Sequence, residues 1–180
     1  NYKLLRDKAG RSDIIAVVKA NAYGHGSESI ANTLYQEGCT SFAVTDAEEG
    51  ATLRSTLTNR DCNILLLSGI FDANDALLST QHQLTPVITT TQQFEYLMDA
   101  KFEGDVWVKV DTGMHRIGTA DLDELLGLVQ DSPMQLVGIM SHLACADTPE
   151  HPLNAWQFKT FKAIQTKHQA SQYSLLNSAG

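Results

Sequence analysis

The chain alternates short apolar segments with longer segments whose apolar residues recur at helical spacing. The short segments are rich in Val, Ile and Leu, and they occupy residues 14–18, 41–45, 63–67, 84–88, 105–110, 135–140 and 173–176. Apolar runs of this length are typical of strands that are buried on both faces of a sheet. Their alternation with helical segments predicts parallel βαβ units throughout the chain.

Local signals support the helical segments between these strands. The apolar spacing predicts helices over residues 27–38, 46–57, 73–78, 91–100, 122–129 and 153–167. Asp46 followed by Glu49 has the pattern of a capping box at the start of a helix. In the last helical segment, Trp156, Phe161 and Ile164 are expected to face the core.

Charged and polar residues recur where the predicted strands end: Lys19, Lys109 to Arg116, His142, and Asn177 with Ser178. A doubly wound sheet would fit the same alternation. A TIM-type (β/α)8 barrel fits better, because a barrel brings the carboxyl ends of all its strands to one face. A complete barrel takes about 250 residues. We therefore predict that residues 1–180 form one incomplete α/β barrel domain with about seven of the eight strands.

Lys19 closes the first predicted strand and is followed by Ala-Asn-Ala-Tyr-Gly-His-Gly. A lysine amine that is partly shielded at a strand end can act as a nucleophile toward an aldehyde cofactor. The alternative is that Lys19 only extends its stem along apolar surface and holds its charge in water. The small and turn-forming residues after it favour the first interpretation.

Residues 109–118 read Lys-Val-Asp-Thr-Gly-Met-His-Arg-Ile-Gly at the end of the fifth strand. Strand alternation predicts that Lys109 and Asp111 share one face, opposite the valines. If that face lines the barrel, these charges need partners, because an unpaired buried charge is costly. A purely structural ion pair of Asp111 with Lys109 or with Arg116 is the alternative to a functional site.

Two further strand ends carry polar groups. His142 follows the sixth strand in Ser-His-Leu-Ala-Cys-Ala-Asp, and it is either a site residue or a hydrogen-bonded structural histidine. Asn177 and Ser178 follow the seventh strand. They could simply cap a helix, although exposed donors at a helix start also suit a phosphate.

The composition argues against several classes of partner. The net charge of −8 and a pI near 5.1 disfavour binding to nucleic acid or to an anionic membrane surface. No apolar run approaches the roughly 20 residues of a membrane span. Cys39, Cys62 and Cys145 lie far apart without the spacing of a metal site, so we expect a reducing cytoplasm and no metal.

The stretches around Lys19, Lys109 to Arg116, His142 and Ser178 resemble, in order, four signatures of the alanine racemases. In that family the lysine matching Lys19 holds pyridoxal phosphate and serves as one catalytic base. The tyrosine matching Tyr23 contacts the cofactor phosphate. The resemblance therefore implies a cofactor-binding barrel domain that uses pyridoxal phosphate.

The same resemblance implies roles for the other strand ends. Arg116 would help to stabilise the substrate and the phenolic oxygen of the cofactor. Lys109 would support Arg116, since the matching lysine can be carbamylated. His142 would lie beside the cofactor ring, and Ser178, with Asn177 beside it, would bind the phosphate.

The implied activity is that of an isomerase, interconverting L- and D-alanine in the cytoplasm and supplying D-alanine for peptidoglycan. The family works as a homodimer in which a C-terminal β-domain supplies the second base, a tyrosine, to the partner subunit's site. The chain begins at Asn1 and stops at Gly180 directly after a motif, so we expect both ends to be cut and the 180 residues alone to be inactive. A racemase for serine, lysine or a broader set of amino acids remains an alternative. Another is a non-catalytic protein of pyridoxal phosphate homeostasis on the same barrel.

Overall fold

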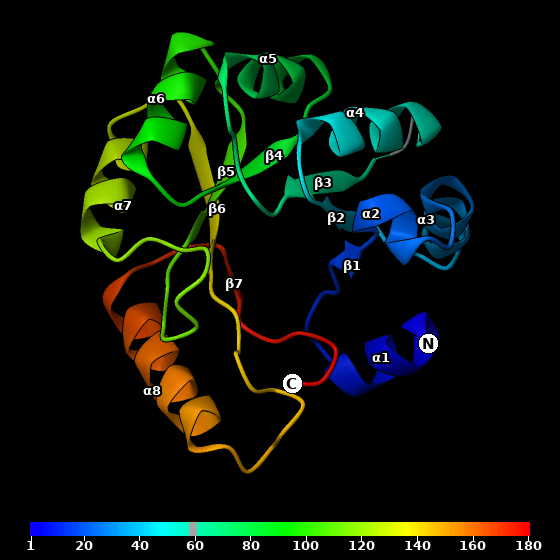
Figure 1. The fold of residues 1–180 in the computed structure, drawn as a ribbon, viewed down its shortest axis with the longest axis vertical. Helices are drawn as coiled ribbons and strands as arrows, with labels where there is room; N and C mark the ends of the chain where they lie inside the picture. The colour runs from blue at the N-terminus through cyan, green and yellow to red at the C-terminus, as the bar shows by residue number, and fades with distance from the viewer. Residues whose placement is uncertain (58–60) are drawn as a thin grey trace.

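Seven parallel strands form one curled sheet in the computed structural model, which describes residues 1–57 and 61–180 (Figure 1). The strands are β1 (Ala16–Val17), β2 (Ser41–Val44), β3 (Asn63–Leu66), β4 (Thr85–Ile88), β5 (Asp105–Lys109), β6 (Gln135–Met140) and β7 (Gln172–Ser174). Their order in the sheet is their order in the chain. A doubly wound sheet would reverse that order at one point, so the prediction of an unfinished α/β barrel is confirmed.

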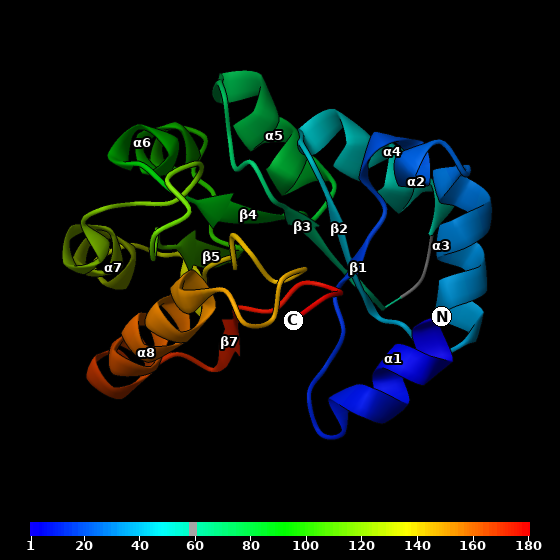
Figure 2. The same cartoon turned by 60° about the horizontal axis from the view of Figure 1, so that its bottom comes forward.

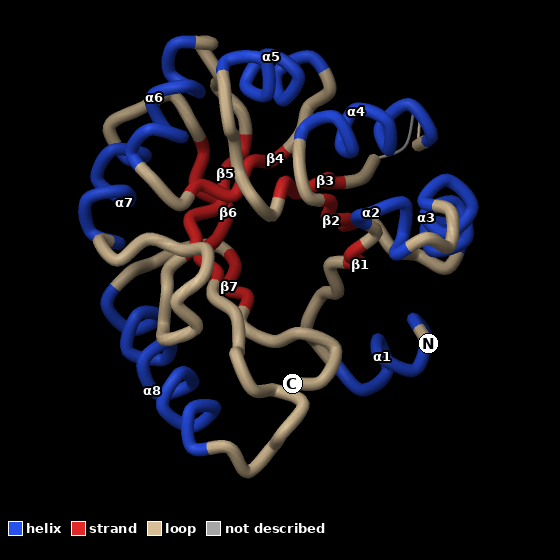
Figure 3. The backbone as a smooth tube through the Cα atoms, in the orientation of Figure 1, coloured by secondary structure: helices blue, strands red, loops and turns tan. Residues whose placement is uncertain are grey.

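Helices cover the outside of the strands, and the ring stays open between β7 and β1 (Figures 1 and 3). The helices are α1 (Tyr2–Ala9), α2 (Lys19–Tyr23), α3 (Ser27–Gln36), α4 (Ala47–Thr56), α5 (Ala73–Gln81), α6 (Thr91–Asp99), α7 (Leu122–Gln130) and α8 (Pro152–Lys167). Within the described ranges, none of them combines the length and the apolar character that a bilayer crossing requires.

Side-chain caps define where several of these helices begin. The side chain of Asp46 accepts a hydrogen bond from the Glu49 N–H at the start of α4, which is one half of the predicted capping box. The Glu49 carboxylate accepts from the Thr45 and Ala20 N–H groups, rather than from the N–H of Asp46 as in a complete box. Asp72, Thr90 and Asp121 accept equivalent bonds at the starts of α5, α6 and α7. Each cap satisfies one backbone donor that the first turn of a helix leaves free.

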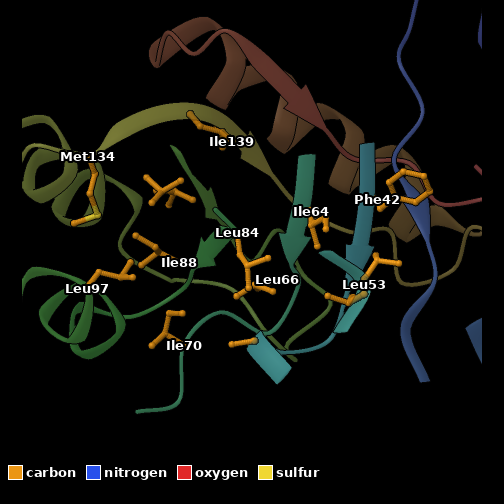
Figure 4. Close-up of a cluster of buried hydrophobic side chains, with 14 of the residues drawn as sticks. Phe42, Leu53, Ile64, Leu66, Ile70, Leu84, Ile88, Leu97, Met134 and Ile139 are labelled. Atoms are coloured by element: carbon orange, nitrogen blue, oxygen red, sulfur yellow. The ribbon is translucent and has the colours of Figure 1, made fainter. Parts of the chain in front are cut away.

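The larger core lies between the strands and the helices. Alternate strand residues point outward into it, among them Phe42, Ile64, Leu66, Ile88 and Ile139, and they pack against helix residues such as Leu53 and Leu97 (Figure 4). The helices cover this outer face of the sheet, and the barrel interior covers the inner face. The strands are therefore apolar on both faces, as expected for a parallel sheet.

A smaller core fills the barrel itself, from the other face of each strand. Its buried members are Ala43, Leu65, Val87, Trp107 and Met140. The register between β5 and β6 shifts after Val106, and Gly138 then lies opposite Trp107. A Cβ at Gly138 would lie 2.5 Å from the Trp107 ring, so only glycine leaves room for this indole.

Some local expectations were wrong. Helix α1 was not predicted. The Arg6 guanidinium attaches this helix to the chain after α3 by donating to the carbonyl of Glu37 at 3.0 Å, and Lys3 forms an ion pair with Glu37. Among the residues that the structure describes, strand β1 pairs with β2 alone, and it covers only Ala16–Val17. Strand β7 ends at Ser174 rather than at residue 176.

The buried face of α8 also differs from the expectation. Trp156 is half exposed, and the buried positions are Gln157 and Phe161. Ile164 packs against the core as predicted. Residues 157, 161 and 164 follow the spacing of one helical stripe, so the prediction was right at Phe161 and Ile164 and wrong at Trp156, whose expected inward position Gln157 takes.

Candidate active site

The predicted site residues follow the carboxyl ends of different parallel strands. Lys19 comes two residues after β1, Lys109 is the last residue of β5, and His142 comes two residues after β6. Asn177 comes three residues after β7. Because every strand pair is parallel, these positions lie at the same end of the barrel.

The segment that begins at Lys19 has an unusual backbone. Ala20, Asn21, Ala22 and Tyr23 have φ between 50° and 55°, so α2 is mostly a left-handed turn. Left-handed backbone costs an L-residue roughly 1–2 kcal/mol. Strain of this kind is often found at functional sites. The sequence favoured a turn here, but four successive left-handed residues were not expected.

Hydrogen bonds around the turn offset this strain. The Ala22 N–H donates to the Val18 carbonyl at 2.9 Å, and the Gly26 N–H donates to the Asn21 carbonyl at 2.9 Å. The side chain of Asn21 accepts from the Ser27 N–H at 2.8 Å, which ties the turn to the start of α3. The turn is therefore held at both of its ends.

Lys109 lies inside the barrel and is only 7 % exposed. It shares the inner face of β5 with Trp107, as strand alternation predicted, while Val106 and Val108 belong to the outer core. Burial lowers the pKa of Lys109, and the nearby charges of Arg116 and Lys19 lower this pKa further. Three cationic side chains thus influence one another at this end of the barrel.

Asp111 does not neutralise this group directly. One carboxylate oxygen accepts hydrogen bonds from the backbone N–H groups of Gly113, Met114 and His115, at 2.7 to 3.1 Å. Burial alone would raise the pKa of Asp111, but these amides and the His115 imidazole hold it below its usual value. Within residues 1–57 and 61–180, the ion pair of Asp111 is with His115 at 3.5 Å, so the alternative pairing with Lys109 or Arg116 is wrong.

Arg116 lies on the loop that Asp111 organises, and its side chain is exposed. Its charge lowers the pKa of both Lys109 and His142, so the loop brings it within electrostatic range of these two residues. Among residues 1–57 and 61–180, no hydrogen bond or ion pair holds this exposed guanidinium, so it could meet a ligand.

His142 is half buried just after the end of β6. Burial lowers its pKa, and Lys109, Arg116 and Lys19 each lower this pKa further. At neutral pH the imidazole is therefore uncharged, and it can offer one N–H donor and one nitrogen acceptor.

Gln157 on α8 is a residue that the sequence analysis missed. Its side chain is fully buried and accepts a hydrogen bond from the Ala144 N–H at 2.9 Å. Its amide nitrogen donates to the His142 carbonyl at 2.9 Å and to the Thr112 hydroxyl at 3.2 Å. The Thr112 hydroxyl in turn lies 2.7 Å from that of Ser141. Gln157 thereby joins the loop that carries Arg116 to the strand end that carries His142.

The other predicted residues are less closely tied to this group. Tyr23 is 62 % exposed in the left-handed turn. Asn177 accepts a hydrogen bond from the Ala179 N–H, and Ser178 is exposed. Gly180 lies against Leu143, so the segment after β7 reaches the loop that follows His142. In the described part of the chain, no hydrogen bond or ion pair joins Tyr23 or Ser178 to Lys19.

The residues present suit an anionic ligand with a carbonyl group. The charges of Lys19, Lys109 and Arg116 all act on His142, and the carboxylate of Asp111 is occupied by backbone amides. This local excess of positive charge occurs in a protein whose net charge is −8. Phosphate and carboxylate groups would neutralise the excess, and a lysine amine at the site could bond to an aldehyde.

Fold and site together define a ligand-binding domain built as an unclosed α/β barrel, with its cationic centre at the carboxyl ends of the strands. The family model for the alanine racemase N-terminal domain matches residues 1–180. The chain belongs to the alanine racemase family.

Individual relatives agree with this assignment. Alanine racemase from Rhizobium meliloti is 36% identical over 187 residues, which cover 100% of this chain and 48% of that protein. Alanine racemase from Acidithiobacillus ferrooxidans is 38% identical over 189 residues, covering 100% of this chain and 51% of that protein. The chain thus spans about half the length of the curated relatives it matches.

Solved structures share the fold. Biosynthetic alanine racemase from Pseudomonas aeruginosa superposes with a TM-score of 0.89 at 36% identity, over 99% of this chain and 50% of that chain. Alanine racemase from Bartonella henselae, solved with covalently bound pyridoxal phosphate, gives 0.87 at 30% identity over 99% and 54%. Histidine racemase from Leuconostoc mesenteroides gives 0.82 at 25% identity over 98% and 50%.

Proposed function

We propose that this chain is the barrel part of a pyridoxal-phosphate-dependent amino-acid racemase that interconverts L- and D-alanine. The observation that carries the proposal is that Lys19, Lys109 and His142 lie at the carboxyl ends of three parallel strands, with Arg116 on the loop after β5. The charges of Lys19, Lys109 and Arg116 all lower the pKa of the His142 imidazole. The membership of the chain in the alanine racemase family, and the cofactor bound covalently in the Bartonella henselae relative, support the same assignment.

Each residue has a role that follows from its chemistry. Lys19 would bind the cofactor aldehyde through its amine and, once released by substrate, move a proton to or from the substrate Cα. Arg116 would attract the substrate carboxylate with its exposed guanidinium. His142, being neutral, would hydrogen-bond without adding charge. Lys109, once carbamylated, would carry a negative charge and hold the Arg116 guanidinium in place.

Bound pyridoxal phosphate would supply an electron sink that makes the α-hydrogen of an amino acid acidic. Tyr23, Asn177 and Ser178 would bind its phosphate with hydroxyl, amide and backbone donors. Racemisation requires acid and base groups on opposite faces of the reacting carbon. We propose that Lys19 serves one face and that a tyrosine from a partner subunit serves the other, in a cytoplasmic homodimer that supplies D-alanine for peptidoglycan.

A second candidate is racemisation of a different amino acid. The similarity to a histidine racemase favours this candidate, since one barrel serves enzymes with different substrates. The two candidates predict the same cofactor chemistry at Lys19 and differ in the amino acid that the enzyme turns over fastest.

The test begins with the full-length protein, pyridoxal phosphate and borohydride, which fixes the cofactor to the amine that holds it. Peptide mapping should find the label on Lys19, and Lys19→Ala should remove both the label and the formation of D-alanine from L-alanine. A label on Lys109 would show that the wrong lysine had been assigned. Binding without turnover of any amino acid would instead support a role in cofactor homeostasis.

A further inference from the structure

Glu49 connects the turn at Lys19 to the neighbouring strand. It lies in the first turn of α4, which packs beside α2 (Figures 1 and 2), and its side chain is half buried. One carboxylate oxygen accepts from the Thr45 N–H at 2.8 Å, directly after β2. The other accepts from the Ala20 N–H at 2.7 Å, in the peptide that directly follows Lys19. Glu49 therefore bridges the carboxyl ends of β1 and β2.

The chemistry of this bridge requires a carboxylate. Both partners of Glu49 are N–H donors, and they bond to different oxygens. A carboxylate accepts at both oxygens, whereas a glutamine amide would present its NH₂ group to one of the two donors.

The same position in α6 shows the contrast. Gln93 also stands three residues after the helix cap, and its oxygen accepts from the Thr89 N–H at 2.8 Å. Its second partner is the carbonyl of Ser68, to which its NH₂ group donates at 3.0 Å. An amide suits one donor and one acceptor, and a carboxylate suits two donors. The residue type at each position thus matches the peptide groups it must hold.

The bond to Ala20 lies at the start of the left-handed turn. Ala20 is the first of the four left-handed residues, with φ of 50°. A hydrogen bond to an ionised acceptor is stronger than one between neutral groups. Without this hydrogen bond, the peptide group between Lys19 and Ala20 would rotate toward a more common conformation. The Cα–Cβ bond of Lys19 would then point in a different direction.

We propose that Glu49 is a positioning residue for Lys19: its carboxylate holds the Ala20 peptide and thereby fixes the direction in which the Lys19 side chain enters the barrel. The inference rests on the proposed function, in which Lys19 binds pyridoxal phosphate. Glu49 does not touch the cofactor or the substrate in this role, so its effect is on how readily Lys19 captures the cofactor.

The test compares Glu49→Gln with Glu48→Gln in the full-length protein. Glu48 is exposed in the same first turn of α4, so both variants remove one negative charge from that turn. Cofactor-free protein is mixed with pyridoxal phosphate, samples are reduced with borohydride at timed intervals, and the label on Lys19 is measured. Capture should be at least ten-fold slower in Glu49→Gln and within two-fold of the unmodified protein in Glu48→Gln.

A second readout does not depend on the cofactor. Hydrogen exchange at the Ala20 amide should be faster in cofactor-free Glu49→Gln than in Glu48→Gln. If Glu49→Gln does not fold, Glu49→Asp replaces it; this variant keeps the charge but reaches only one amide, and the same slowing of capture is expected.

The outcomes separate the two proposals. Equal capture and equal exchange in the Glu49 and Glu48 variants, with the unmodified protein labelled at Lys19, would overturn the role of Glu49 and leave the proposed function intact. An unmodified protein that carries no label on Lys19 would overturn both.

Discussion

Replacing Gln157 with leucine should separate the two loops that this residue joins. Glutamine and leucine differ little in volume, so the substitution leaves no large cavity on the buried face of α8. It removes the hydrogen bonds to the Ala144 N–H, the His142 carbonyl and the Thr112 hydroxyl. The effect should therefore come from these three polar partners.

The magnitude follows from these bonds. Each hydrogen bond contributes a net of about 1 kcal/mol, and a buried group left without a partner costs about 1–3 kcal/mol. The added apolar burial of leucine offsets part of this loss. We expect Gln157→Leu to lower the free energy of unfolding by about 2–4 kcal/mol, which for a slope of about 2 kcal/mol per molar urea shifts the midpoint by roughly 1–2 M.

The assay is urea unfolding of the cofactor-free full-length protein, followed by circular dichroism. Gln165→Leu is the control, because Gln165 lies two turns further along α8 and is only partly buried. Exchange of the Ala144 amide should also become faster in Gln157→Leu, since its acceptor is gone. If the two variants unfold at the same urea concentration, the network around Gln157 does not stabilise the protein as described.

Two further predictions concern the electrostatics of the site. Lys109→Met should raise the pKa of His142 toward its ordinary value, because Lys109 lowers this pKa more than any other charge does. Proton NMR titration of the cofactor-free protein measures this pKa. The control variant Lys101→Met, at a residue before the amino end of β5, should leave the pKa of His142 unchanged. Because the folded state lowers the pKa of His142, it binds a proton less readily than the unfolded state, and stability must rise with pH. The folding stability that depends on an uncharged His142 is therefore fully present above about pH 6.5 and is lost as the pH falls below that value. In urea unfolding between pH 7 and 5, His142→Gln should lose less stability than the unmodified protein, and an equal loss would contradict the shift.

The features that depend on neighbouring residues in the sequence could be predicted. The alternation of residues along β5 correctly predicted that Lys109 faces the barrel interior together with Trp107, because strand periodicity is a local property. The helix cap by Asp46 was likewise visible in the sequence. The sequence also predicted that the site residues lie at one end of the barrel, because the carboxyl ends of parallel strands lie on the same side.

The features that depend on distant contacts could not. Helix α1 is secured by Arg6 and Glu37, which lie 31 positions apart, and none of its own residues is buried. The left-handed turn needs Glu49, 29 positions from Ala20. Gln157 was not identified, because the contacts that call for a polar side chain inside are not local: its partners Thr112, His142 and Ala144 lie 45, 15 and 13 positions away.

The strictly sequential order of the strands has a consequence for how the chain acquires its fold during synthesis. Leu65 pairs with Thr85 and Ile139 pairs with Tyr173, so partners in adjacent strands lie about 20 to 34 positions apart. At roughly 5–20 residues per second, a ribosome takes a few seconds to make each new strand and helix. The helices that connect the strands form within about a microsecond. Each strand can therefore join the sheet soon after it leaves the ribosome, without waiting for later parts of the chain.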